Sequence, residues 1–349
     1  MGDAELHRYT KLPELLLPWY RSFARDLPWR RDREPYHVWL SEVMLQQTRV
    51  EVVSDYYRRF LAEVPDLAAL AALPEQRLLK LWEGLGYYNR ARNLQKAARD
   101  IMENRGGIFP ESYPELLSLA GVGPYIAGAV ASICFELPRA AVDGNVLRVI
   151  SRIMEDRAPI DLPATRKSIG EKLERVYPAG ACGAFTQALM ELGATVCAPG
   201  NPDCGSCPVR EICLARKNGT ASELPVKREK KEKKVQERTV LLLRCDDAYA
   251  LLRRPEGGLL SGLWQLPDTE GSLTAEEALE LAKELGVRPV ELCRELHRVH
   301  IFTHIKWQMV CYHIKCTEKV PSFVWADARQ LREEYALPTA YRMFLDEEP

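Results

Sequence analysis

The sequence of 349 residues has no long apolar run and no excess of either charge. Nowhere does it approach the roughly 18 consecutive apolar residues of a membrane-spanning helix, and no apolar stretch follows the acidic residues at Met1–Glu5. We therefore expect a cytoplasmic protein without a secretion signal or a membrane partner. The formal net charge of −1 does not indicate a polyanionic partner, so a DNA-binding prediction must rest on local features.

Cysteine, by contrast, is plentiful, and four of the ten cysteines lie within residues 197–213. In a reducing compartment such a group is more typical of a metal site than of disulfides. Zinc ribbons usually pair two C-x2-C motifs and this run has one, so we favour one [4Fe–4S] cluster that shapes the loop, with zinc as the alternative. The four ligands would be Cys197, Cys204, Cys207 and Cys213. The remaining six are predicted to be core thiols.

The spacing of apolar residues changes along the chain. From Leu12 to about Cys213 they recur with a helical period, in runs such as 67–82, 94–102 and 146–154, which predicts an all-α half. After Pro225 the stretch 226–234 is almost entirely charged. It predicts a solvated linker, with contact to phosphate as the alternative.

Beyond this stretch the pattern predicts strands and a helix. Residues 240–244 and 249–253 flank Asp246 and Asp247 as a hairpin, and residues 307–314 form a further strand. A helix at 274–285 would have Thr274 as N-cap and stop at Gly286. The chain is therefore predicted to be multi-domain, with an all-α domain at 1–225, a charged linker at 226–236 and an α+β domain at 237–349.

A glycine turn separates two predicted helices of the first half. A short helix ends at Gly121, and Pro124 is suited to be the first residue of the next helix. The pattern predicts a helix-hairpin-helix, in which Gly121 and Gly123 let the backbone approach a phosphate and the new helix offers unpaired N–H groups. A helix connection without a ligand is the alternative. Leu119 and Ala127, which anchor the two sides, favour DNA.

Two carboxylates are candidates for chemistry. Asp143, in the segment 142–146 (VDGNV), stands where the N-cap of an apolar helix would stand; capping alone would explain it, but its place shortly after the hairpin could bring it to the sugar of bound DNA. Glu42 lies in a strongly apolar helical segment, where desolvation should raise its pKa as a general acid requires. A buried ion pair of Glu42 with an arginine such as Arg30 is the alternative.

These features together resemble the endonuclease III superfamily of DNA glycosylases over residues 1–225, and within it the MutY-type adenine DNA glycosylases. The subfamily resemblance is carried by the segments 27–30 (LPWR), 41–48 (SEVMLQQT) and 82–92 (WEGLGYYNRAR). The glycosylase-lyases of the superfamily have a lysine at the second position after the hairpin's last glycine, and this chain has Tyr125 there. The resemblance therefore implies a monofunctional enzyme that cuts the N-glycosidic bond and leaves the strand intact.

The resemblance also implies catalytic roles. Glu42 would protonate the departing adenine and later activate water, and Asp143 would stabilise an oxocarbenium-like sugar or attack it transiently. Tyr125 and Asn145 would complete the catalytic group. The adenine must first be flipped out of the duplex.

DNA contacts are implied as well. The flipped adenine would lie in a pocket formed by Trp29 and Arg30. The residues that would enter the base stack or contact the opposite base are Gln47, Thr48, Leu85 and Tyr87. The implied partner is double-stranded DNA with an adenine:8-oxoguanine or adenine:guanine mispair, bound by a monomeric, nucleoid-associated protein.

The second half resembles the Nudix-like domain with which these enzymes recognise 8-oxoguanine opposite adenine. In the segment 279–287, Lys283 replaces one of the magnesium-binding carboxylates of a working Nudix hydrolase, so we predict a lesion reader. Phe302, Thr303 and His304 are similar to the lesion-sensing loop of the family, which usually has Ser where Thr303 stands. The hydroxyl is kept, but the added methyl group could crowd the loop.

Two alternatives come from different classes. A bifunctional pyrimidine-lesion glycosylase and AP lyase of the endonuclease III type is disfavoured by Tyr125 and by the C-terminal domain. A non-catalytic, cluster-containing DNA-binding or redox-sensing protein would not need a carboxylic acid in an apolar surrounding.

Overall fold

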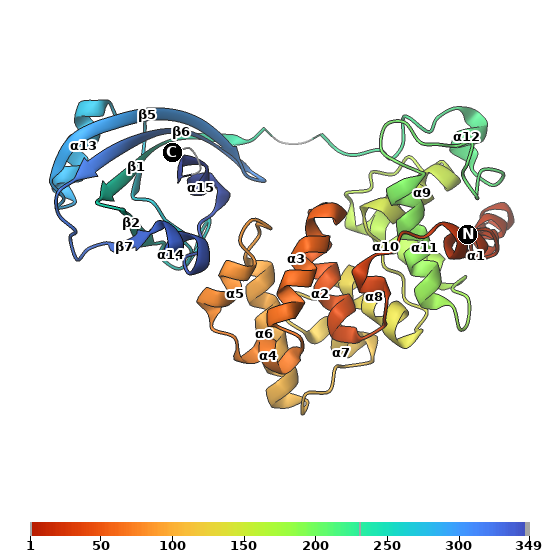
Figure 1. Ribbon diagram of the computed structural model, residues 1–349. Helices are drawn as coiled ribbons and strands as arrows, with labels where there is room; N and C mark the ends of the chain where they lie inside the picture. Colours follow the sequence, from red (N-terminus) through yellow and green to blue (C-terminus); the bar gives the residue numbers. More distant parts are fainter. Residues whose placement is uncertain (1, 230–231, 346–349) are drawn as a thin grey trace. The chain divides into compact units, whose positions relative to one another are not determined.

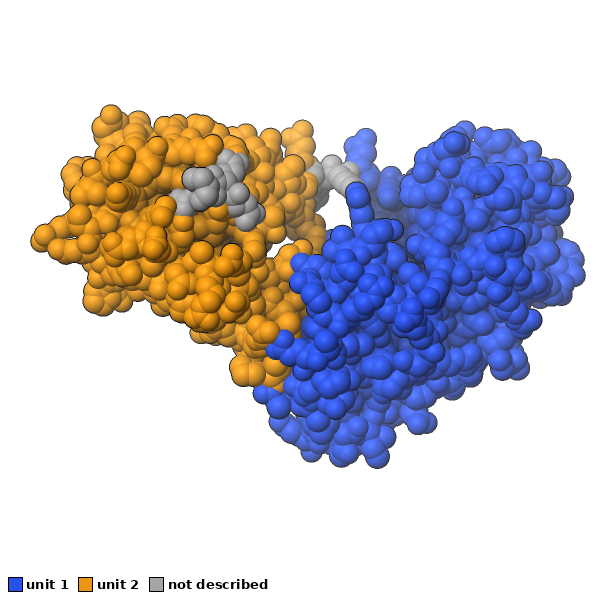
Figure 2. Space-filling view, in the orientation of Figure 1, with its two compact units in different colours: residues 1–72, 93–229 blue, residues 73–92, 230–349 orange. Residues whose placement is uncertain are grey.

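The computed structural model describes residues 2–229 and 232–345, and the chain forms two compact units (Figures 1 and 2). The first unit comprises residues 1–72 and 93–229, and the second comprises residues 73–92 and 230–349. A segment of the predicted all-α half, residues 73–92, is thus grouped with the C-terminal part. In the described ranges no helix has the length and apolar character needed to span a membrane.

The first unit is helical, as predicted. Its elements are α1 (Asp3–Phe23), η1 (Pro28–Arg30), α2 (Pro35–Leu45), α3 (Val50–Glu63), α4 (Leu67–Ala72), most of α6 (Asn89–Asn104), α7 (Tyr113–Ser118), α8 (Pro124–Phe135), α9 (Gly144–Met154), α10 (Pro163–Glu174), α11 (Cys182–Thr195) and α12 (Leu214–Asn218). One core joins α1, α9, α10 and α11 through residues such as Leu12, Ile150 and Phe185, all nearly inaccessible to solvent. The predicted run 67–82 forms two helices, α4 and α5 (Glu75–Leu81), because Pro74 cannot continue a helix.

In the described part of the second unit, seven strands form a mixed sheet. The strands are β1 (Lys234–Cys245), β2 (Ala248–Arg253), β3 (Trp264–Gln265), β4 (Asp268–Glu270), β5 (Pro289–Ile301), β6 (Ile305–Cys316) and β7 (Val324–Asp327). The main order is β3-β2-β1-β6-β5, with β4 paired to β1 and β7 paired to β2. β1 and β6 run parallel and the other pairs are antiparallel. The predicted hairpin is confirmed, with Arg244 opposite Tyr249.

Helices cover both faces of this sheet, since alternate residues of a strand point to opposite sides. On β1, Leu242 packs with α14 (Ala328–Glu333) and α15 (Thr339–Leu345). Its neighbour Leu243 packs with α13 (Ala275–Glu284) on the other face. The predicted cap of α13 is confirmed, because Thr274 forms a capping box with Glu277. The result is an α+β unit, as expected.

Two details differ from the expectations. β1 begins at Lys234, so residues 234–236 of the predicted linker are strand; they pair with β6 from Ile305 onward. Lys230 and Lys231 of that linker lie outside the described residues. Cys293 is exposed rather than a core thiol, because it lies on the sheet's edge strand β5, most of whose residues are exposed.

Candidate active site

An open cavity in the first unit gathers the predicted catalytic and adenine-binding residues. η1, α2, α8, α9 and α11 all contribute to its lining. The predicted residues in its wall are Trp29, Arg30, Glu42, Thr48, Tyr125, Asp143 and Asn145. Residues that lie far apart in the sequence are thus brought to one place, which makes the cavity the candidate active site.

Glu42 is held in this cavity as a buried acid. α2 is buried almost all round, from Tyr36 to Met44, so the helix carries the carboxyl group into the interior, where Glu42 is 5% exposed. Burial raises the pKa of Glu42 to about 7, although a hydrogen bond donated by the Tyr125 hydroxyl favours the ionised form. A substantial fraction of Glu42 therefore carries a proton at neutral pH, as general acid catalysis requires.

Tyr125 lies on the first turn of α8, and its hydroxyl donates to Glu42 Oε2. Burial and the neighbouring carboxylates raise the pKa of Tyr125 well above its ordinary value, so the phenol stays protonated. A phenol can donate this hydrogen bond but cannot form a Schiff base with a sugar. Tyr125 therefore contacts Glu42 and offers no amine nucleophile at this position.

Asp143 is the N-cap of α9, as predicted, and it also faces the cavity. One carboxylate oxygen accepts from the Val146 N–H (2.7 Å) and the other accepts from Asn145 Nδ2 (2.8 Å). Arg148 in turn donates to Asn145 Oδ1 (2.8 Å). Burial raises the pKa of Asp143, and these hydrogen bonds oppose the rise by favouring the ionised form. Asp143 can thus cap α9 and face the cavity at the same time, and the two hydrogen bonds that it accepts orient its carboxylate.

Glu191 on α11 is a functional candidate that the sequence reasoning missed. Its side chain is fully buried, and it accepts hydrogen bonds from Arg25 (2.7 and 2.9 Å) and from Arg30 Nη2 (2.8 Å). Burial raises the pKa of Glu191, but the two arginines outweigh it and lower the value to about 2. The alternative in which Arg30 pairs with Glu42 is therefore wrong. Glu42 was singled out because it is a lone carboxylate in an apolar helical segment. Glu191 is likewise a lone carboxylate in the apolar segment of α11, so the same criterion would have identified it.

The predicted helix-hairpin-helix is formed by α7 and α8. Gly121 has φ +75°, and a Cβ there would lie 2.7 Å from Asn93 Cβ, so both the turn and the packing require glycine. Gly123 is the N-cap of α8 and has open space in front of it. The hairpin thus leaves room for a ligand to approach the backbone at the start of α8.

Two of the predicted base-stack residues have unusual backbone conformations. Gln47 has φ +60° and follows α2 in the first unit, and Tyr87 has φ +47° in the second unit. Left-handed residues other than glycine typically cost about 1–3 kcal/mol and are frequent at functional sites. The Tyr87 side chain is 49% exposed, whereas Leu85 is 5% exposed and offers little side-chain surface.

The predicted reading loop connects β5 and β6. Phe302 packs edge-on against Trp307, with ring centroids 4.8 Å apart, and Thr303 Oγ1 lies 2.9 Å from the Tyr87 hydroxyl, within hydrogen-bond distance. The structure therefore joins two residues that the sequence had placed in different domains. On α13, Lys283 forms an exposed ion pair with Glu280 (2.5 Å).

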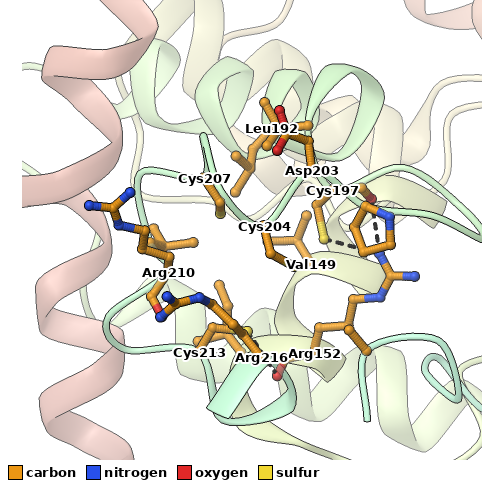
Figure 3. Close-up of a pocket in the computed structure, with 15 residues that line it drawn as sticks. Val149, Arg152, Leu192, Cys197, Asp203, Cys204, Cys207, Arg210, Cys213 and Arg216 are labelled. Atoms are coloured by element: carbon orange, nitrogen blue, oxygen red, sulfur yellow. Dashed lines mark hydrogen bonds between the residues drawn. The ribbon is translucent and has the colours of Figure 1, made fainter. Parts of the chain in front are cut away.

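The four clustered cysteines line a second, small pocket (Figure 3). Arg152 extends from α9 into its wall, and its Nη1 donates to Cys197 Sγ (3.3 Å). Each iron of a [4Fe–4S] cluster takes one cysteine, so such a cluster needs four thiolates around a common space. The four side chains meet that requirement. Over the described ranges, no three His, Cys, Asp or Glu side chains are arranged to hold a single metal ion.

Comparison with known proteins identifies the family. The family model described as HhH-GPD superfamily base excision DNA repair protein matches residues 40–177, and the NUDIX domain model matches residues 239–347. The adenine DNA glycosylase of Mus musculus is 34% identical over 95% of this chain and 77% of its own length, and that of Homo sapiens is 34% identical over 96% and 74%. The chain belongs to the adenine DNA glycosylase family.

Solved structures of other DNA glycosylases share the fold of much of this chain. A thermostable thymine-DNA glycosylase matches with a TM-score of 0.56 and 29% identity, covering 62% of this chain and all of that one. An endonuclease III in a non-covalent complex with DNA matches with a TM-score of 0.52 and 25% identity, covering 63% and 99%. The predicted family, the fold class and the prediction of a DNA glycosylase are thereby confirmed.

Proposed function

We propose that this DNA glycosylase removes adenine from mispairs with 8-oxoguanine or guanine in double-stranded DNA, as a monofunctional enzyme of base excision repair. The observation that carries the proposal is the cavity itself, in which the buried Glu42 and Asp143, the N-cap of α9, face the same space. Its walls include Trp29 and Arg30. The relatives are named adenine DNA glycosylases, which supports adenine as the base removed.

The proposed reaction uses the two carboxyl groups differently. With adenine flipped into the cavity, Glu42 donates its proton to N7, the C1′–N9 bond breaks and neutral adenine departs. Asp143, oriented by the hydrogen bonds from Val146 and Asn145, stabilises the positive charge that develops on the sugar. The Glu42 carboxylate then takes a proton from water as the oxygen adds to C1′, which regenerates the acid. Asn145 holds Asp143 in place, and Tyr125 holds Glu42 in place.

Strand cleavage is not part of this proposal. A lyase would need an amine to displace the base and form a Schiff base with the sugar, and Tyr125 provides a phenol bonded to Glu42. The product would be an intact strand with an abasic site. We propose that the protein works as a monomer in the cytoplasm and associates with the nucleoid when it is bound to DNA.

DNA contacts extend the proposal beyond the cavity. Gly121 and Gly123 would let the hairpin bind phosphate, and an endonuclease III matched by this fold is described in complex with DNA. Domain 1–225 would carry excision, and domain 237–349, after the linker 226–236, would read the opposite base. The proposed lesion-contact residues are Gln47, Thr48, Leu85, Tyr87, Phe302, Thr303 and His304. The hydrogen bond between Tyr87 and Thr303 supports a common reading role for these two.

A single [4Fe–4S] cluster is proposed for the cysteine cavity. Cys197, Cys204, Cys207 and Cys213 would each bind one iron, and the cluster would act structurally, since no coordination position would be left for substrate. Arg152 would donate to the Cys197 sulfur.

Replacing the general acid tests the proposal. Glu42→Gln keeps the size of the side chain but cannot donate the proton, so single-turnover release of adenine opposite 8-oxoguanine should fall roughly 10²–10⁴-fold while binding of that duplex is retained. Glu171→Gln, at an exposed carboxylate of α10, is the matched control and should behave as wild type. A near-normal rate for Glu42→Gln would refute the catalytic assignment.

A further inference from the structure

Residues 73–92 are joined to the C-terminal part by a buried group of ionic side chains. Lys80 and Glu83 have side chains only 7% and 9% exposed, and their charged atoms are 2.7 Å apart. Lys80 Nζ also donates to the backbone carbonyls of Leu331 (2.8 Å) and Tyr335 (3.1 Å), so its three protons all have acceptors. This group lies on the face of the sheet that α14 and α15 cover.

Glu83 is bound from two further directions. Its Oε1 accepts from the Leu337 N–H (2.8 Å), and its Oε2 accepts from Arg342 Nη1 on α15 (2.6 Å). We refer to Lys80, Glu83 and Arg342 as the anchor cluster. Its contacts to Leu331, Tyr335, Leu337 and α15 fix the end of α5 to the helices that cover one face of the sheet.

A short turn connects the anchor cluster to Tyr87. Three of its residues are left-handed: Gly84 (φ +96°), Gly86 (φ +68°) and Tyr87 itself (φ +47°). Arg90 Nη2 donates to the carbonyls of Leu85 (3.0 Å) and Gly86 (3.3 Å), and its guanidinium lies 5.5 Å from the ring centre of Tyr87. A turn held in this way transmits the position of Glu83 to Tyr87, because few of its torsions are free to adjust.

The C-terminal part therefore fixes both the backbone that precedes Tyr87 and the hydroxyl group of its side chain. The anchor cluster fixes the chain shortly before it, at Glu83, and Thr303 of the reading loop meets its hydroxyl at 2.9 Å. A hydrogen bond of this length is lost when its partners separate by roughly 1 Å. Small movements of α5 should thus change the distance between the Tyr87 hydroxyl and Thr303 Oγ1.

We propose that Lys80, Glu83 and Arg342 are positioning residues that set Tyr87 against Thr303 and thereby determine how strongly the enzyme prefers adenine opposite 8-oxoguanine to adenine opposite guanine. The inference rests on the proposed function of the reading loop. Removing the Glu83 carboxylate leaves the Lys80 ammonium buried without its counter-charge. The end of α5 must then shift or admit water, and Tyr87 loses its alignment.

The test compares single-turnover excision of adenine opposite 8-oxoguanine and opposite guanine. Glu83→Gln should reduce the ratio of the two rates about tenfold, the value of one hydrogen bond, and leave excision opposite guanine within about twofold of wild type. Glu333→Gln, at an exposed carboxylate on α14, is the matched control and should keep the ratio. Should Glu83→Gln prove unfolded by thermal melting, Arg342→Gln, at a partly exposed partner, replaces it with the same expectation.

A double-mutant cycle separates positioning from general destabilisation. If the anchor cluster acts through Tyr87, the effects of Glu83→Gln and Tyr87→Phe on the rate ratio should not add. Additive effects, or a wild-type ratio in folded Glu83→Gln, would overturn the inference. Failure of the wild type to release adenine, or to prefer 8-oxoguanine, would instead count against the proposed function.

Discussion

Two buried glutamates line one cavity, and their substitution by glutamine should change stability in opposite directions. Glu42 has its pKa raised from 4.5 to about 7, chiefly by burial. Burial also acts on Glu191, but hydrogen bonds from Arg25 and Arg30 lower its pKa to about 2. The same chemical change, Glu to Gln, thus removes an unfavourable ionisation in one case and a favourable one in the other.

The sign for Glu42 follows from proton binding. Folded Glu42 holds its proton to a higher pH than unfolded Glu42, so its contribution to stability is complete below pH 4.5 and is lost as pH rises to about 7. At about 1.4 kcal/mol per pKa unit, the loss is ~3 kcal/mol. The amide introduced by Glu42→Gln does not ionise. The free energy of unfolding of this variant, relative to wild type, should therefore increase by ~3 kcal/mol between pH 4.5 and 7 and then stay constant.

Glu191 gives the opposite sign. Its contribution is present above pH 4.5 and is lost only as pH falls to about 2. Glu191→Gln should be less stable than wild type at neutral pH by ~3 kcal/mol, because two arginines lose their carboxylate.

Thermal and denaturant unfolding of the three proteins at about pH 5 and about pH 8 measures both effects. We expect the free energy of unfolding of Glu42→Gln to increase relative to wild type between the two pH values, and Glu191→Gln to be the less stable variant at both. A Glu42→Gln protein that is less stable than wild type at the higher pH, or whose difference from wild type does not change with pH, would refute the assignment of Glu42 as a buried neutral acid.

Two further predictions concern the site and the cluster. Tyr125→Phe removes a hydrogen bond that favours ionised Glu42, so the high-pH decline of the single-turnover rate should move upward by about one pH unit; a decline that stays in place or moves down contradicts the contact. Replacing Cys204 and Cys207 by serine should abolish the iron content of anaerobically purified protein and lower its melting temperature. Stoichiometric zinc without iron in the wild-type protein would refute the assignment of an iron–sulfur cluster.

Local signals made the helices, caps and hairpin predictable. Asp143 and Thr274 cap their helices because short polar side chains at those positions accept from the next turn. The burial of Glu42 was also predictable, since the helix around it is apolar on every side.

What the sequence did not disclose are contacts between distant segments. Glu191 binds Arg30 from 161 positions away, and Tyr87 meets Thr303 from 216 positions away. Such pairs depend on how helices and loops pack, and periodicity carries no information about them. The grouping of residues 73–92 with the C-terminal unit was missed for the same reason.

The central claim is tested most directly by base release from duplexes carrying adenine opposite 8-oxoguanine, guanine or thymine, with half of each single-turnover reaction heated in alkali. We expect cleavage of the adenine strand only after alkali, fastest opposite 8-oxoguanine. Cleavage without alkali, or cleavage confined to damaged pyrimidines, would contradict it and favour a bifunctional enzyme.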